Sequence, residues 1–134
     1  HGIDIYRAKV TNSAIRYNAA NGINFCNCGG GGQSVIEGNV VERNRLHGVA
    51  TGSGMVSNNY ITTNGGAGVF VNPSGNNGAS IIGNVIDFNL GNAINAYSGM
   101  YRGNTMRSNL STASHQVVGS AADGGQNICL GGAC

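Results

Sequence analysis

Glu42 and Asp87 are the residues whose spacing comes closest to that of a catalytic pair. They occupy the same position in the segments VVE and VID, which belong to repeated units about two units apart. If these segments are stacked parallel strands, the carboxylates lie about 9.5 Å apart. That distance is the upper edge of the separation found in inverting glycoside hydrolases.

The same spacing places an arginine beside each acid, Arg16 next to Glu42 and Arg107 next to Asp87. A neighbouring guanidinium group lowers the pKa of a carboxylic acid, which does not suit a general acid. We therefore expect a solvated ladder of ion pairs, and we keep both carboxylates as catalytic candidates.

His47 is the third catalytic candidate, because an imidazole can accept a proton near neutral pH. It precedes Gly48 in a predicted turn beside Arg45, and no carboxylate in that turn would orient its ring. We expect a histidine on the surface of a turn. His1 aligns with His47 as the same repeat position, so we interpret it as a repeat residue rather than a copper ligand.

Carboxylates are scarce, which argues against a calcium-dependent mechanism. One predicted strand column has the outward residues Asp4, Asn24, Ala50, Phe70 and Asn95, with a single carboxylate among them. Calcium requires several oxygen ligands, usually with carboxylates among them. We predict no metal and no cofactor.

The four cysteines lie near opposite ends of the chain, as Cys26 and Cys28 and as Cys129 and Cys134. A gap of one residue is poorly suited to two ligands of one tetrahedral zinc ion. Local disulfides in a secreted chain are the better interpretation. For Cys26 and Cys28 we expect a mutual bridge, with free thiols as the alternative, rather than a link to the tail.

A repeat positions all of these residues. The units SAIRYNAANGI, NVVERNRLHGV, NYITTNGGAGV and NVIDFNLGNAI share an Asn five residues after a small polar residue, and later a Val or Ile. The recurring Asn stands at positions 18, 44, 64, 89 and 109, so that the bare repeat is 20 residues. Two repeats carry insertions, CNCGGGGQ after Phe25 and NPSGNNG after Val71. Both insertions fall at the same corner, where we expect binding.

Three short apolar stretches recur in each repeat. Their central residues are almost all Val or Ile, which favour strands, and Gly or Asn bounds each stretch. No segment has a helical period over three turns. The columns are Ile3, Ile23, Val49, Val69 and Ile94; Val10, Ile36, Val56, Ile81 and Tyr101; and Ile15, Val41, Ile61, Ile86 and Met106. The sequence therefore predicts an all-β, three-sided parallel β-solenoid of five to six coils of 20–26 residues.

The recurring asparagines suit the corners of such a solenoid. Asn tolerates the left-handed backbone conformation that a sharp corner needs. Identical amides stacked one coil apart can also bond one another. We expect Asn18, Asn44, Asn64, Asn89 and Asn109 to stack in line and to have no catalytic role.

Residues 1–109 resemble the right-handed parallel β-helix repeat family of the pectate-lyase-like superfamily. The ending QNICLGGAC resembles the Cys-x4-Cys tail of secreted bacterial members. The resemblance implies a right-handed helix, a Cys129–Cys134 disulfide, and a secreted, periplasmic or cell-surface location. Its members include polysaccharide lyases, hydrolases, uronan epimerases and phage tailspikes, but the acidic clusters of the lyases and hydrolases have no counterpart here.

We therefore expect a module without a complete catalytic constellation that contacts carbohydrate or has a structural role in assembly. The alternative is a polysaccharide lyase, glycoside hydrolase or uronan epimerase, or a fragment of one. For binding we select the predicted outward and turn residues Asn24, Arg45, His47, Phe70 and Asn95. The net charge of +2 and the short apolar runs give no indication of nucleic acid or of a membrane.

Two regions are expected, residues 1–109 as β-helix coils and residues 110–134 as a diverged last coil with a disulfide-closed cap. Residue 1 already lies in mid-coil, in register with His47. We expect that the first coil is uncapped, and that either the natural chain continues upstream or two chains pair through this end.

Overall fold

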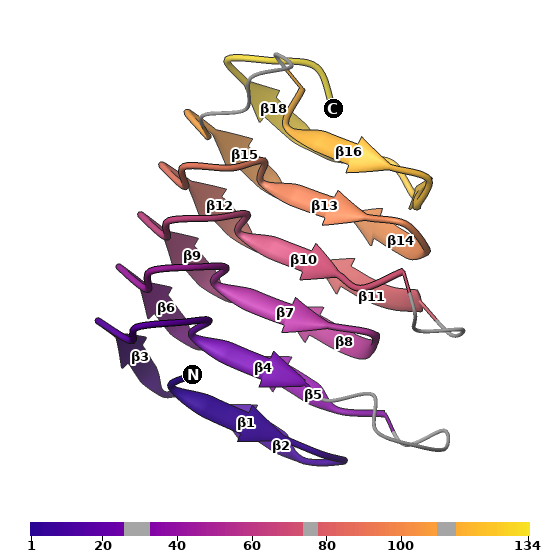
Figure 1. Ribbon diagram of the computed structural model, residues 1–134. Helices are drawn as coiled ribbons and strands as arrows, with labels where there is room; N and C mark the ends of the chain where they lie inside the picture. Colours follow the sequence, from indigo (N-terminus) through magenta and orange to yellow (C-terminus); the bar gives the residue numbers. More distant parts are fainter. Residues whose placement is uncertain (26–32, 74–77, 110–114) are drawn as a thin grey trace.

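The computed structural model describes residues 1–25, 33–73, 78–109 and 115–134, and these form strands and turns without any helix. The strands make three parallel sheets of six strands each. In Figure 1 the strands of the first sheet run across the front from left to right while the chain rises from the N-terminus to the C-terminus, and the chain returns behind them. This is a right-handed, three-sided β-solenoid, as predicted, with six stacked coils.

Each coil contributes one strand to each sheet. The first sheet contains β1 (Ile3–Ile5), β4 (Ile23–Phe25), β7 (Val49–Thr51), β10 (Val69–Val71), β13 (Ile94–Ala96) and β16 (Val117–Gly119). The second contains β2 (Lys9–Thr11), β5 (Val35–Glu37), β8 (Ser53–Ser57), β11 (Gly78–Ile82), β14 (Gly99–Arg102) and β17 (Ala122–Asp123). The third contains β3 (Ala14–Arg16), β6 (Val40–Glu42), β9 (Tyr60–Thr62), β12 (Val85–Asp87), β15 (Thr105–Arg107) and β18 (Ile128–Leu130).

The core is a column of β-branched side chains, because each strand turns the centre of its apolar stretch inward. The three predicted columns pair in register from coil to coil, for example Ile23 with Val49, Ile36 with Val56 and Val41 with Ile61. In the middle coils these side chains are completely or almost completely buried. Burying each one contributes about 1.5–3 kcal/mol, so the core stabilises every coil by a similar amount.

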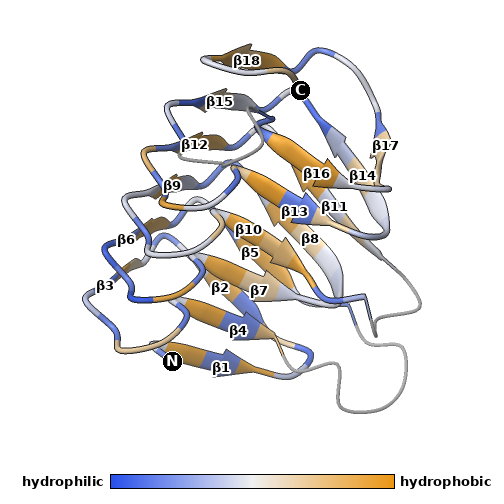
Figure 2. Ribbon diagram, turned by 45° about the horizontal axis from the view of Figure 1, so that its top comes forward, coloured by the Kyte–Doolittle hydropathy of each residue, from blue (hydrophilic) through white to orange (hydrophobic). Residues whose placement is uncertain are grey.

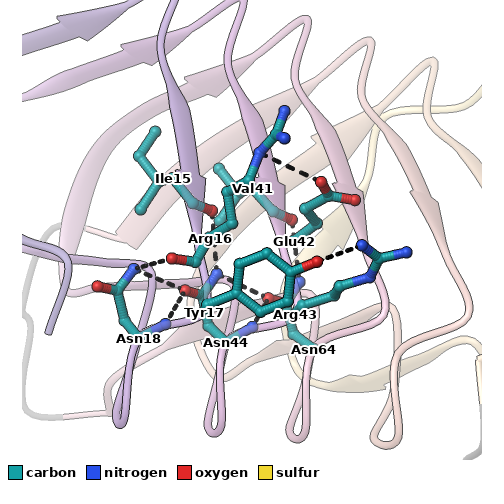
Figure 3. A network of polar contacts seen from close by, with 9 residues as sticks. All are labelled: Ile15, Arg16, Tyr17, Asn18, Val41, Glu42, Arg43, Asn44 and Asn64. Atoms are coloured by element: carbon teal, nitrogen blue, oxygen red, sulfur yellow. Dashed lines mark hydrogen bonds and ion pairs between the residues drawn. The ribbon is translucent and has the colours of Figure 1, made fainter.

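Two ladders of buried asparagine amides join the coils at two corners. In the first, the Asn18 amide donates to Asn44 Oδ1 at 2.8 Å and the Asn44 amide donates to Asn64 Oδ1 at 2.9 Å. The Asn44 amide also donates to the carbonyl of Ile15 in the coil below, at 3.3 Å. Figure 3 shows this part of the ladder with its strand carbonyls. The ladder continues through Asn89 and Asn109, so the predicted stacking is confirmed.

The second ladder runs one corner earlier along each coil. Its members are Asn39, Asn59, Asn84, Asn104 and Asn127.

The predicted backbone conformation of the ladder asparagines is wrong. The left-handed residue at each corner is the one before the ladder residue, with φ between 51° and 58° at Tyr17, Arg43, Thr63, Phe88 and Ser108. This preceding residue turns the chain, so that the next side chain points into the stack and can reach its neighbours. Asparagine is selected here for its amide, and not for its tolerance of positive φ.

Glycine recurs before the first strand of the coil because the ladder passes close to that backbone. A Cβ atom on Gly48 would lie 2.5 Å from Ile61 Cγ2 and 2.9 Å from Asn64 Nδ2. Only a residue without a side chain fits there without displacing the ladder. The recurring Gly-Val and Gly-Ile pairs therefore follow from packing at this corner.

The C-terminal end closes the first ladder with a different residue. Gln116 is buried, and its Oε1 accepts a hydrogen bond from the Asn109 amide at 2.7 Å. In the sixth coil, Gly132 occupies the position equivalent to Asn109, and it has no amide side chain. Beside it, Cys129 and Cys134 form a disulfide with a Cα–Cα distance of 5.5 Å, which confirms that predicted pair. Cys26 and Cys28 lie outside the described residues.

A candidate binding notch on the first sheet

The outward face of the first sheet is less polar in its middle strands than in the strands on either side. Its central outward column contains Asp4, Asn24, Ala50, Phe70 and Asn95, in the predicted register. Figure 2 shows a hydrophilic band across β1 and β4 that is interrupted at β7 and β10 and returns at β13. Ala50 has the smallest side chain of the five, so the surface is hollowed between Asn24 below it and Phe70 above it.

This hollow has a volume of about 280 Å³, and we call it the notch. Three of the five residues selected from the sequence for binding, Asn24, His47 and Phe70, meet in it. The residues that line it are Asn21, Asn24, Phe25, Leu46, His47, Ala50, Thr51, Phe70 and Asn72. Phe25 directly precedes the first insertion and Asn72 begins the second, so the notch lies at the corner where binding was expected.

Two aromatic rings from adjacent coils stack at the notch. The rings of His47 and Phe70 have centroids 4.7 Å apart and an interplanar angle of 10°. Phe70 therefore has an aromatic partner on this face. An offset stacked pair of this kind contributes about 0.5–1.5 kcal/mol beyond its buried area, and it fixes both rings at the rim of the notch.

A backbone hydrogen bond orients the imidazole of His47. Its Nδ1 accepts a hydrogen bond from the N–H of Ala67 at 3.0 Å, so in the neutral ring the proton is on Nε2. Burial lowers the pKa of His47 below its ordinary value. The predicted surface histidine is thus half-buried, and a main-chain N–H of the next coil, rather than a carboxylate, orients its ring.

The opposite side of the notch consists of amides that bond one another. The Asn21 side chain donates to Asn24 Oδ1 at 3.3 Å, and the Asn24 amide donates to Asp4 Oδ1 at 2.7 Å. Asn21 Oδ1 accepts the backbone N–H of His47 at 3.1 Å, which joins this side to the aromatic rim. The polar wall is held in place from one coil to the next.

The binding residues selected from the sequence did not include the other six that line the notch, Asn21, Phe25, Leu46, Ala50, Thr51 and Asn72. A usable signal exists for Asn21, because the position before the recurring Gly contains His1, Asn21 and His47 in successive coils. Each member accepts the backbone N–H of the next coil, as shown by the 3.3 Å bond from the Asn21 N–H to His1 Nδ1. The column is a third polar ladder, built from two residue types.

Arg45 and Asn95 do not join the notch. Arg45 is exposed on the turn before His47, and Asn95 lies one coil above Phe70 in the outward column. The Oδ1 atom of Asn95 is buried, and among the residues that the structure describes it has no hydrogen-bond partner.

The catalytic candidates Glu42 and Asp87 lie on the third sheet, with Thr62 between them in the same outward column. Arg16 Nε is 3.3 Å from Glu42, and Arg107 contacts Asp87 Oδ2 at 2.9 Å and 3.0 Å, so the predicted pairing is confirmed. The predicted solvation is wrong for Asp87, whose side chain is completely buried. Both carboxylates are engaged by arginine, and His47 stands on a different corner of the coil.

The described residues contain no group of three or more His, Cys, Asp or Glu side chains that could hold a metal ion. Across residues 1–25, 33–73, 78–109 and 115–134 there is also no helix with the length and apolar character needed to cross a membrane.

Comparisons with protein-family models, with curated proteins and with solved structures found no match. The chemistry of the notch is therefore the basis for a functional assignment.

Proposed function

We propose that this chain is a non-catalytic, carbohydrate-binding β-solenoid module that works outside the cytoplasm. The observation that carries the proposal is the notch, in which a fixed aromatic pair faces a wall of asparagine amides. Sugars present both apolar C–H faces and hydroxyl groups, so a site for them needs aromatic surface and neutral hydrogen-bonding groups together. Ligand sites in general combine apolar and aromatic surface with a few fixed polar groups.

Two further features support the location and the substrate class. The Cys129–Cys134 disulfide is the kind of bond that persists in an oxidising compartment, where extracellular glycans are found. The coil pattern also resembles that of the pectate-lyase-like superfamily, many of whose members act on polysaccharides. The enzyme alternative is weaker, because Glu42 and Asp87 are both occupied by arginine.

The test is a screen of the purified chain against immobilised and soluble polysaccharides, together with the variants Phe70→Ala and Phe88→Ala. Phe88 is 52% exposed at a different corner, so it is a matched aromatic control outside the notch. We expect binding that Phe70→Ala weakens about tenfold or more, since a lost aromatic contact of this size costs roughly 1–2 kcal/mol. Phe88→Ala should bind as the unchanged chain does.

The same samples should be assayed for new reducing ends and for unsaturated ends that absorb ultraviolet light. Cleavage that is lost on neutralising Glu42 or Asp87 would replace the binding module with the enzyme alternative. Binding that Phe70→Ala and Phe88→Ala weaken equally would remove the notch from the proposal.

A further inference from the structure

The charge around the notch narrows the class of ligand. The nine residues that line it include no acidic residue, no lysine and no arginine. The chain has seven Lys and Arg residues, all within the described ranges, and none of them lines the notch. Most of these cations are engaged elsewhere, as with Lys9 beside Glu37, Arg43 over Tyr17 and Arg107 on Asp87.

A negatively charged ligand would therefore enter a partly buried site that offers no counter-ion. Removing a carboxylate from water without a compensating partner is costly. An uncharged sugar has no such cost, and its hydroxyl groups can bond to amides and to a neutral imidazole. The volume of about 280 Å³ lies just below the usual range for ligand pockets, which suits a single ring better than an extended chain.

The fold also defines which ring nitrogen of His47 remains available to a ligand. Its Nδ1 is already used by the N–H of Ala67. The remaining ring nitrogen, Nε2, carries the proton, and among the described residues no side chain or main-chain group bonds to it. The stack on Phe70 holds the ring plane, so the direction of the Nε2–H group is fixed as well.

Resting on the proposed function, we propose that the notch recognises one uncharged sugar unit and that the Nε2–H group of His47 donates a hydrogen bond to an oxygen atom of that unit. His47 is then the specificity-determining residue of the site. A sugar oxygen can accept this bond, whereas a protonated amine at the same position could not.

The chain itself supplies the variant that tests this role. Asn21 occupies the same repeat position as His47, and its Oδ1 accepts the backbone N–H of the next coil. The substitution His47→Asn therefore keeps an acceptor for Ala67 while it removes the ring and the Nε2–H donor. His1→Asn is the matched control, because His1 makes the equivalent backbone bond and does not line the notch.

Binding should be measured by calorimetry and by NMR titration with neutral glucose- and galactose-based oligosaccharides, and with oligogalacturonates as charged counterparts. The unchanged chain should bind a neutral oligosaccharide at least tenfold more tightly than any uronate. His47→Asn should weaken that binding about tenfold, which corresponds to the loss of one hydrogen bond and one ring contact. His1→Asn should leave it within about twofold.

The pH dependence gives a second measurement that needs no variant. Protonation of His47 removes the Nδ1 acceptor and leaves the buried N–H of Ala67 without its partner. The Nε2–H group itself remains after protonation, but the ring loses the bond that orients it. Because the pKa of His47 is lowered by burial, the ring is neutral at pH 7, and affinity should fall only as the pH drops through its titration point, read by NMR. The ionisable groups connected to this part of the fold are Arg45, two residues before His47, Asp4, which bonds to Asn24, and His1, which bonds to the backbone of Asn21.

The outcomes separate the two proposals. If no carbohydrate binds, the proposed function fails and this inference fails with it. If carbohydrates bind but uronates bind as tightly as neutral sugars, or if affinity ignores both His47→Asn and the titration of His47, the inference alone is overturned.

Discussion

At the scale of single residues, two ion pairs in one column differ in the burial of their acids. Arg16 and Arg107 are equally exposed, at 48% and 47% of their side-chain surface. Their partners differ, because the Glu42 side chain is 18% exposed and the Asp87 side chain is 0% exposed. One oxygen of Asp87, Oδ1, is buried without a hydrogen-bond partner among the described residues, so its charge depends on Arg107.

Removing each arginine should therefore have different consequences. Arg107→Ala leaves a buried carboxylate without its counter-charge and should lower the free energy of unfolding by about 3 kcal/mol. Arg16→Ala leaves a partly solvated carboxylate and should cost less than about 1 kcal/mol. Urea denaturation followed by circular dichroism measures both. An equal decrease in the free energy of unfolding in the two variants would mean that the burial of Asp87 does not affect stability.

At the scale of the elements, the corner before each ladder asparagine determines the path of the chain. At the other ladder corner the left-handed residue is Gly38, Gly83 or Gly103 in three coils, and glycine adopts this conformation at no steric cost. At the first corner Thr63 adopts it with φ 56°, although a β-branched side chain is strained there. The corner geometry is thus imposed by the stack rather than by local preference.

Thr63→Gly should relieve this strain and stabilise the protein by about 0.5–1 kcal/mol, even though glycine gains entropy in the unfolded chain. Thr105→Gly is the matched control, because Thr105 is in strand β15 and glycine is unfavourable in a strand. That control should lose about 1 kcal/mol. Thermal unfolding of both variants measures the effect, and a destabilised Thr63→Gly would show that the corner is not strained.

The elements also show how far the sequence could predict this molecule. The three apolar columns, the register and the stacked asparagines were predictable, because a period of 20 residues places equivalent side chains directly above one another. The notch was only partly predictable. His47 and Phe70 stand in different columns of adjacent coils, and a comparison of equivalent positions does not bring such diagonal neighbours together. The burial of Asp87 was missed for a related reason, since two side chains in the same column can differ in how deeply they are buried.

At the scale of the whole molecule, the last coil is fastened by side chains that the other coils do not use. Gln116 ends the first ladder, and its backbone N–H donates to the carbonyl of Ala133 at 2.8 Å. Ala133 lies within the loop that the Cys129–Cys134 disulfide closes. In a solenoid each coil contacts only its neighbours, so loss of one fastening acts locally. The expected pairing of two chains through the first coil stays a prediction.

Cys134→Ser should therefore loosen the last coil without unfolding the rest. A closed loop of this length is worth about 2 kcal/mol in the chain-entropy description. The amide of Gln116 should lose roughly thirtyfold of its protection against hydrogen exchange, while the amides of β7 and β10 keep theirs. Protection lost evenly along the chain would show instead that the coils unfold as one unit.

The direction of the asparagine ladders has a consequence for how such a molecule can change in length. In the bonds between asparagines of both ladders, each amide donates to the C-terminal neighbour and each Oδ1 accepts from the N-terminal one. Each middle coil therefore presents amide donors to the coil after it and Oδ1 acceptors to the coil before it, so any middle coil can stack on any other. A duplication or deletion of one whole repeat leaves each amide with a partner, whereas a change of a few residues within a bare coil leaves several without one. Lengths that differ by whole coils are therefore open to this architecture, while the two long insertions, after Phe25 and after Val71, both leave the ladders intact.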